Sequence, residues 1–163
     1  MTSRTNGSLR IRTATPDEVE VLLEIQKASA VAGFGHVFPQ DKYPFPSEAV
    51  LDRWQKAVDD PAEVVVLAEF DGAAVGLAAV RAEWLDALYV VPSCWGMGVG
   101  PRLHDHALAW IRDFGCERGN LWVLEQNTRA RRFYEKRGWR LNGETRIVPF
   151  PPYPTDVGYT IEL

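Results

Sequence analysis

Cysteine is scarce in this chain, which has only Cys94 and Cys116 among its 163 residues. Two cysteines provide no disulfide framework, so we expect two free thiols and a reducing, cytoplasmic location. The chain also has no run near the roughly 20 apolar residues that span a bilayer, and no apolar signal core follows its polar N-terminus. The sequence therefore predicts no membrane partner.

Positive charge is not in excess, because the chain has 18 Lys and Arg and 22 Asp and Glu, which gives a net charge of -4. This balance argues against a general nucleic-acid surface. A metal site is also not expected, since His104 and His106 lie two apart in a predicted helix and do not share a face. The hydrophobic fraction of 46% is ordinary for a globular protein. We expect one domain over residues 1–163, with a flexible leader at residues 1–8.

Strand-like and helix-like segments alternate along the chain. The predicted strands run over Leu9 to Arg12, Glu63 to Phe70, Ala74 to Val80, Leu85 to Val91, Leu121 to Leu124 and Val157 to Leu163, with a further one starting at Trp139. The predicted helices begin at the caps Thr15, Ser47, Gly100 and Asn127, and the last two end at Gly115 and Gly138.

Residues 33–46 form an irregular segment rich in aromatic residues, Pro and Gly. Loops of this kind often determine specificity, so the segment is either the wall of an acceptor pocket or a packed connector. His36 within it either lines such a pocket or is structural.

Alternating glycines follow the predicted strand that ends at Val91. Gly96, Gly98 and Gly100 precede Pro101, which suits the first position of a helix. Glycines allow close backbone approach, and a helix start offers free N–H groups, so the loop suits phosphate. The alternative is a turn with nothing bound. Neither a nucleotide P-loop nor a dinucleotide fingerprint fits this spacing.

The segment Trp95–Gly100 resembles the pyrophosphate-binding motif of the GNAT N-acetyltransferase superfamily, Arg/Gln-x-x-Gly-x-Gly/Ala, with Trp95 in the Arg/Gln position. A second segment, Asn127–Trp139, resembles the motif Asn-x-x-Ala-x-x-Phe-Tyr-Glu-x-x-Gly-Phe. Two motifs in the correct order are more specific than either alone, and the order of elements in the first half agrees.

The resemblance implies an α/β (α+β) fold with a mixed, mostly antiparallel central sheet, flanked by helices and splayed between two central strands to admit acetyl-CoA. Acetyl-CoA is the implied co-substrate, and no metal is implied. Asn127 would contact the pantetheine arm, and the Tyr134 hydroxyl would lie near the thioester sulfur. The remaining implied contacts come from the backbone: Tyr89, Val90 and Val91 for pantetheine, and Gly96, Met97, Gly98, Val99 and Gly100 for pyrophosphate.

The implied reaction needs a proton donor for the thiolate and a base for the attacking amine. Tyr134 is our candidate acid; the alternative is a core aromatic residue. By strand alternation Asp86 shares the face of Leu88 and Val90, which makes it our first candidate base. Glu83 is the second candidate base, and a β-bulge would turn its side chain to the face where the amine is expected. Either carboxylate acts directly or through water, or is simply exposed.

We therefore predict an N-acetyltransferase that moves an acetyl group from acetyl-CoA to a primary amine by direct attack. The alternative is a non-catalytic acyl-CoA-binding or regulatory module, and a longer acyl donor also stays open. The acceptor, a small molecule or a peptide, cannot be read from the chain. We expect the Cys94 thiol to be inert. We expect Arg129, Arg131 and Arg132 to form a solvated helix face, from which one of them reaches the 3′-phosphate of CoA. The family resemblance also makes a homodimer through the last strands plausible.

Overall fold

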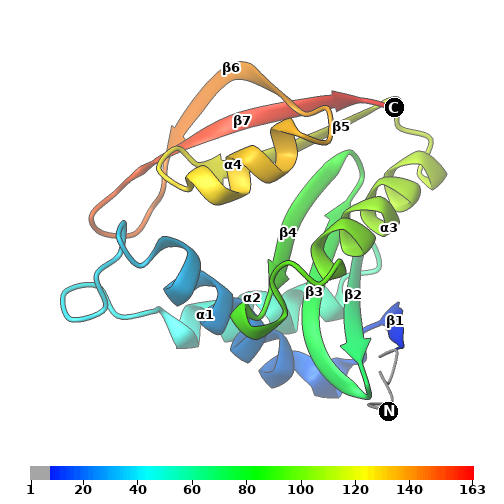
Figure 1. The fold of residues 1–163 in the computed structure, drawn as a ribbon, viewed down its shortest axis with the longest axis horizontal. Helices are drawn as coiled ribbons and strands as arrows, with labels where there is room; N and C mark the ends of the chain where they lie inside the picture. Colours follow the sequence, from blue (N-terminus) through cyan, green and yellow to red (C-terminus); the bar gives the residue numbers. More distant parts are fainter. Residues whose placement is uncertain (1–7) are drawn as a thin grey trace, which may run out of the picture.

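A seven-stranded sheet forms the centre of the computed structural model, which describes residues 8–163 (Figure 1). Its strand order is β1-β2-β3-β4-β5-β7-β6, and neighbouring strands are antiparallel except for the parallel pair β4 and β5. This confirms the predicted mixed, mostly antiparallel sheet. The strands are β1 Leu9–Thr13, β2 Glu63–Phe70, β3 Ala73–Arg81, β4 Trp84–Val90, β5 Arg118–Leu124, β6 Arg140–Ile147 and β7 Thr155–Glu162. The expected leader lies outside the described residues, apart from Ser8.

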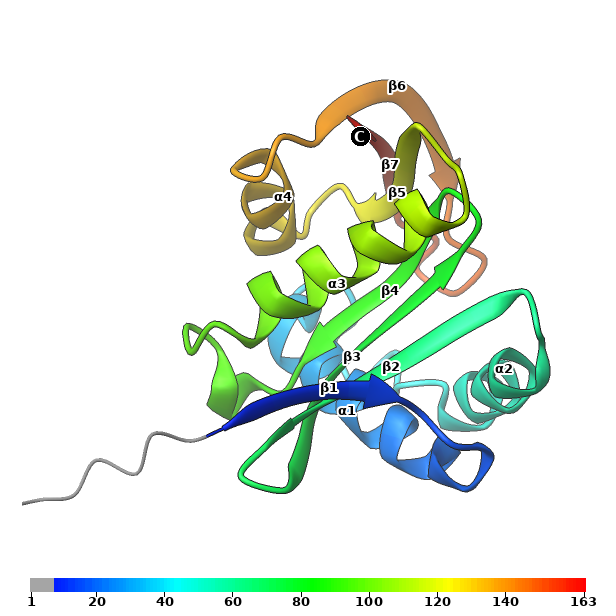
Figure 2. The same cartoon turned by 90° about the vertical axis from the view of Figure 1, so that its right-hand side faces the viewer.

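Helices cover both faces of the sheet (Figure 2). They are α1 Val19–Phe34, α2 Ser47–Asp59, α3 Val99–Asp113 and α4 Thr128–Glu135, with short 3₁₀ turns η1 Pro16–Glu18 and η2 Pro92–Cys94. Helices α1 and α2 pack on one face and α3 packs on the other. In the part of the chain from residue 8 onward, no helix has the length and apolar character needed to cross a membrane.

Strand β2 is apolar on both sides and contributes to two hydrophobic clusters, one on each face of the sheet. Val66 and Ala68 point to the cluster under α3, whereas Val65 and Leu67 point to the cluster under α1 and α2. Helix α3 approaches β3 so closely that a Cβ on Gly76 would lie 2.8 Å from Leu103 Cδ1. The close contact between α3 and the sheet therefore depends on glycine at this position.

The sheet opens between β4 and β5. The two strands pair at one position, Trp84 with Asn120, and then diverge (Figure 1). At this closed end, the Asn120 N–H donates to the Glu83 carbonyl at 2.7 Å, and the rings of Trp84 and Trp122 stack with centroids 6.3 Å apart. The predicted splay between two central strands is confirmed, and it leaves one edge of β4 without a partner strand over most of its length.

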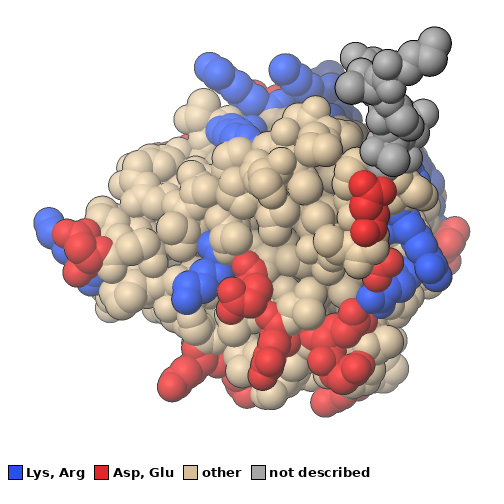
Figure 3. Space-filling view, turned by 60° about the horizontal axis from the view of Figure 1, so that its bottom comes forward, with Lys and Arg blue, Asp and Glu red and all other residues tan. Residues whose placement is uncertain are grey.

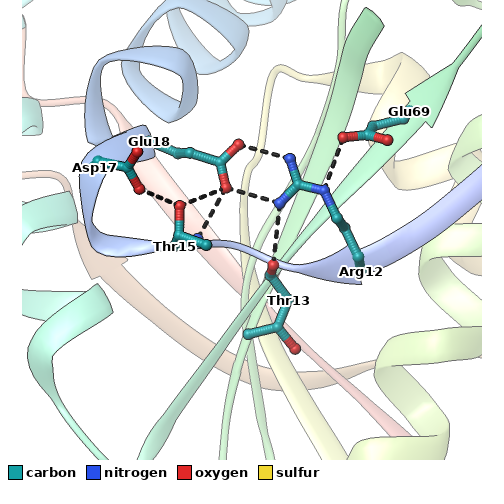
Figure 4. A network of polar contacts seen from close by, with 6 residues as sticks. All are labelled: Arg12, Thr13, Thr15, Asp17, Glu18 and Glu69. Atoms are coloured by element: carbon teal, nitrogen blue, oxygen red, sulfur yellow. Dashed lines mark hydrogen bonds and ion pairs between the residues drawn. The ribbon is translucent and has the colours of Figure 1, made fainter. Parts of the chain in front are cut away.

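A polar network joins β1 to the start of the first helical segment (Figure 4). The Arg12 guanidinium donates to Glu18 and to Glu69 at 2.7 Å, and the Thr15 backbone N–H donates to Glu18 at 2.9 Å. The Thr15 hydroxyl also contacts Asp17. The hydrogen bond from Arg12 lowers the pKa of Glu18 to about 2. The predicted start at Thr15 and Pro16 is confirmed, although the chain first forms the 3₁₀ turn η1.

Two predicted helix starts were wrong by one or two residues. Ser47 is the first residue of α2 rather than its cap, which is Pro46. Helix α3 begins at Val99, because Gly98 adopts the left-handed conformation (φ +85°) and caps it. Pro101 is then the third helical residue, which α3 tolerates because N–H groups in the first turn have no helical acceptor.

Uncharged residues cover most of the centre of the face shown in Figure 3. Asp and Glu gather along its lower margin and Lys and Arg lie along its upper margin, while charges of both signs lie next to each other at its left and right. The net charge of -4 therefore hides local regions of opposite sign.

Candidate active site

The loop between β4 and α3 has the open backbone that the glycine pattern predicts. Gly96 and Gly98 have φ angles of +76° and +85°, and a Cβ built on either would meet nothing within 4 Å. Gly100 differs, since a Cβ there would lie 3.3 Å from the Phe133 ring. The Met97 N–H is used inside the loop, where it donates to the Cys94 carbonyl at 3.4 Å. The loop and the first turn of α3 therefore present backbone at a surface with room for a bulky ligand.

A cavity of about 880 Å³ lies between this loop and α4. Four cationic residues of the α4 segment line it, and none of the lining residues in the described chain is Asp or Glu. The four are Arg129, Arg132, Lys136 and Arg137. Positive side chains beside a helix N-terminus favour an anion, and a phosphate in particular. We call this space the basic cavity.

Trp95, which occupies the Arg/Gln position of the motif, stacks with a cationic side chain of α4. Its indole N–H donates to the Val90 carbonyl at 2.8 Å, which fixes the ring. The Arg129 guanidinium carbon lies 3.6 Å from the ring centroid, within the range of a cation–π interaction. Partial burial lowers the pKa of Arg129. Arg129 is exposed, as expected of the three arginines, but its guanidinium stacks on the loop rather than extending freely into solvent.

Arg131 also departs from that expectation. It donates to the Tyr159 hydroxyl and to the Glu125 carbonyl, both at 2.9 Å, and so ties α4 to β7 and to the β5–α4 turn. Arg132 is exposed at the mouth of the basic cavity.

Tyr134 lines the basic cavity. The residue is 8% exposed, and its ring packs edge-on against Phe133 and Trp139. Burial, and then the neighbouring Tyr89, raise the pKa of Tyr134 above that of an ordinary phenol. No hydrogen bond ties its hydroxyl to another of the described residues 8–163, and the hydroxyl is not sealed from the cavity.

A second cavity, of about 590 Å³, lies on the opposite face of the sheet between α1, α2 and the loops at residues 38–46 and 148–151. Tyr89 lines this cavity, whereas its neighbour Leu88 lines the basic cavity. Gln26 and Ser29, one helical turn apart on α1, also divide between the two. The two cavities therefore share the open edge of β4 as a common wall. We call the second space the aromatic cavity.

The register of β4 determines which backbone groups face the opening. The Val91 N–H donates to the Val75 carbonyl of the β3 segment at 2.9 Å, and Leu77 pairs with Tyr89. Since the bonding direction alternates along an antiparallel strand, the groups of Tyr89 and Val91 face β3, while those of Leu88 and Val90 face the opening. Of the three residues expected to bond pantetheine, only Val90 presents its backbone there.

Asp86 lies in a β-bulge, and the predicted orientation was wrong. Ala87 pairs with Ala79 and Leu85 with Val80, so Asp86 has no partner on β3. The bulge breaks the alternation and turns the Asp86 carboxyl toward Glu63, on the face of Tyr89 rather than that of Leu88.

Glu63 and Asp86 influence each other's protonation. Burial and the Asp86 charge raise the pKa of Glu63 to about 7, and burial also raises the pKa of Asp86. Asp86 lines neither cavity. Glu83, the second candidate base, lies in the turn before β4 at the closed end of the opening, six residues and about 20 Å of strand from Tyr89.

Three further residues have definite positions. Asn127 caps α4 through its side-chain oxygen, which accepts from the Ala130 N–H at 3.2 Å. The His36 ring contacts the Gln126 carbonyl at 2.9 Å and so joins the irregular segment to the β5–α4 turn. Cys94 is a free thiol that lines the basic cavity.

Sequence reasoning did not identify Asp156. The residue is 7% exposed, lines the aromatic cavity and accepts from Arg146 Nε at 2.9 Å. No motif marks it in the sequence, where it follows a Pro-rich loop at the start of a strand that mixes polar and apolar residues.

The family model of the acetyltransferase (GNAT) family matches residues 21–139. The chain belongs to this family. An uncharacterized N-acetyltransferase of Mycobacterium tuberculosis is 35% identical over 96 residues, a match that spans 56% of this chain and 62% of that protein. The peptidyl-lysine N-acetyltransferase YjaB of Salmonella typhimurium is 29% identical over 90% of this chain and 94% of its own.

Solved structures of this family share the fold. A PaiA N-acetyltransferase of Thermoplasma acidophilum, in complex with coenzyme A, superimposes with a TM-score of 0.75 at 19% identity, over 96% of this chain and 99% of its own. YjaB of Escherichia coli, in its apo form, gives a TM-score of 0.73 at 22% identity, over 94% and 97%. At such identities the likeness concerns the fold.

Proposed function

We propose that this protein transfers an acetyl group from acetyl-CoA to a primary amine, with acetyl-CoA in the basic cavity and the amine in the aromatic cavity. The observation that carries the proposal is the unpaired edge of β4, which separates the two cavities and has Tyr134 beside it. An acyl donor and an acceptor that enter from opposite faces would meet at that edge.

The basic cavity suits coenzyme A by charge and by shape. Backbone N–H groups between Gly96 and Gly100 and the helix start at Val99 would bind the pyrophosphate, with Arg129 in place of the motif's Arg/Gln side chain. The Val90 N–H, which faces the opening, would polarise the thioester carbonyl where negative charge develops. The side-chain oxygen of Asn127 already caps α4. A contact between Asn127 and pantetheine stays a prediction.

The reaction that we propose has no covalent enzyme intermediate. The amine nitrogen forms a bond to the thioester carbon, the carbon–sulfur bond breaks, and the thiolate takes a proton from the Tyr134 hydroxyl. A phenol is already protonated at neutral pH, and the raised pKa of Tyr134 keeps that proton in place until the thiolate forms.

The nitrogen loses two protons on going from ammonium to amide: a base takes one before the attack, and the second restores the Tyr134 hydroxyl after the carbon–sulfur bond has broken. Asp86 stays our first candidate base and would act through water, since its carboxyl lines neither cavity. Glu83 lies further away, at the closed end of the opening. The relative YjaB is a peptidyl-lysine N-acetyltransferase, which supports an amine acceptor without identifying which amine.

The test is release of coenzyme A thiol from acetyl-CoA in the presence of a panel of primary amines, with Tyr134→Phe as the variant. Loss of a general acid should lower kcat about 10²- to 10⁴-fold and leave the Kd for acetyl-CoA within about twofold. Parent protein that binds acetyl-CoA but acetylates no amine would favour the non-catalytic module instead. A Tyr134→Phe variant with normal kcat would exclude Tyr134 as the acid.

A further inference from the structure

The aromatic cavity has a chemical character that narrows the acceptor. Most of its wall is apolar and comes from α1, the irregular segment and the β6–β7 loop. The aromatic members of that wall are Phe34, Phe38, Tyr43, Phe45, Tyr89 and Phe150. A volume of about 590 Å³ is within the range of small-molecule sites. An apolar group of the acceptor would be buried here.

One buried carboxylate faces this wall. Asp156 is the only acidic residue among the described residues that line the aromatic cavity. Its Oδ2 accepts from Arg146, whereas no hydrogen bond within residues 8–163 is made by its Oδ1. A carboxylate oxygen inside an apolar cavity is a strong acceptor for an ammonium or amine N–H. Asp156 follows Thr155 at the start of β7 and pairs across the sheet with Leu124, which also lines the cavity.

A cation faces the same cavity from α2. Arg53 lines it and forms no ion pair with any carboxylate in residues 8–163; its one hydrogen bond, at 3.4 Å, goes to the Asp86 carbonyl. Burial raises the pKa of the Tyr89 phenol, and the two charges act on it with opposite signs, Arg53 lowering and Asp156 raising it. Both charges therefore lie within electrostatic range of one hydroxyl at the open edge of β4.

We infer that the acceptor is a free α-amino acid with an apolar or aromatic side chain. Its amine would donate to Asp156 near the open edge of β4, its carboxylate would bind Arg53, and its side chain would occupy the aromatic wall. This inference rests on the proposed function and adds the class of substrate to it. A lysine within a peptide provides no α-carboxylate for Arg53, and the apolar part of its side chain is a narrow stem rather than a ring.

The experiment compares L-phenylalanine with L-phenylalaninamide, which keeps the amine and the ring but lacks the carboxylate. We expect acetylation of L-phenylalanine with a kcat/KM at least tenfold above that of the amide and of a lysine-containing peptide. Arg53→Gln should lower kcat/KM for L-phenylalanine about 10- to 100-fold and leave that for the amide within about twofold. Lys56→Gln is the matched control, because Lys56 is exposed on the same helix and lies outside the cavity.

Asp156→Asn addresses the amine end. It should weaken the binding of L-phenylalanine and of L-phenylalaninamide alike, since both carry the amine. The circular dichroism spectrum of the variant checks that it folds. Calorimetric titration of the parent with L-phenylalanine alone gives a readout that does not depend on turnover.

The outcomes separate this inference from the proposed function. Acetyl-CoA binding with preferred acetylation of the peptide or of a polyamine would overturn the amino-acid inference and leave the acetyltransferase standing. Equal effects of Arg53→Gln on the acid and the amide would also overturn it. Failure of the parent protein to bind acetyl-CoA would contradict both the amino-acid inference and the proposed function.

Discussion

Arg129 offers the sharpest test of how this chain holds coenzyme A without the motif's Arg or Gln. We expect Arg129→Ala to weaken CoA binding. A hydrogen bond to a charged group is worth about 1.5 to 3 kcal/mol, which corresponds to about 10- to 150-fold in Kd. Because Arg129 is largely exposed and a solvated contact is worth less than a buried one, we expect the lower end, about tenfold. Trp95→Leu should show a similar loss, since the indole ring holds the guanidinium in place.

The assay is calorimetric titration with CoA and with dephospho-CoA, which lacks the 3′-phosphate, at low and at high salt. A loss that is equal for both ligands assigns Arg129 to the pyrophosphate, and a loss confined to CoA assigns it to the 3′-phosphate. Arg10→Ala is the control for net charge, because Arg10 is exposed on β1, outside the basic cavity. If Arg129→Ala behaves like Arg10→Ala with both ligands, the stacked arginine does not replace the motif's side chain.

Two carboxyls should give opposite pH dependence of the free energy of unfolding. The pKa of Glu18 is lowered to about 2, so its stabilisation is present above its ordinary pKa near 4.5 and is lost as the pH falls toward 2. Glu18→Gln should cost about 1 kcal/mol at pH 7 and nothing measurable near pH 2. The pKa of Glu63 is raised to about 7, so its contribution is present below 4.5 and is lost as the pH rises through 7. Glu63→Gln should therefore remove a fall in stability on the order of 2 kcal/mol between pH 5 and pH 8. Urea denaturation of parent and variants at pH 2, 5, 7 and 8 measures both, and unchanged pH profiles would contradict the two assignments.

Sequence patterns predicted those parts of the fold that depend on local chemistry. The boundaries of β2 follow from an apolar run that a hairpin turn ends, and Asn127 was identified as a cap because a short polar side chain precedes a helical pattern. The splay between β4 and β5 came from the family resemblance rather than from periodicity, because it depends on strands far apart in the sequence.

Features that depend on a partner element were predicted less well. The bulge at Asp86 is a mismatch of one residue between β4 and β3, and no property of β4 alone reveals it. The backbone direction at Tyr89 and Val91 depends on the same register. The Trp95–Arg129 contact joins two motifs whose sequences are unrelated. Each of these features changes the candidate site without changing the fold.

A homodimer through the last strands stays a prediction. Strand β6 is at the edge of the sheet, and Leu141 and Ile147 on it are 53% and 62% exposed. Sedimentation of the purified protein measures whether this edge is paired in solution.

The central claim is that acetyl-CoA binds at the open backbone between β4 and α3. The most direct measurement is calorimetric titration of acetyl-CoA into the parent and into Gly98→Glu, which places a bulky negative side chain where a Cβ now meets nothing within 4 Å. Circular dichroism and thermal unfolding check that the variant folds, since a non-glycine residue at φ +85° costs about 1 to 2 kcal/mol. We expect stoichiometric binding by the parent and none by the folded variant. Equal binding by both proteins, or no binding by the parent, would contradict this claim.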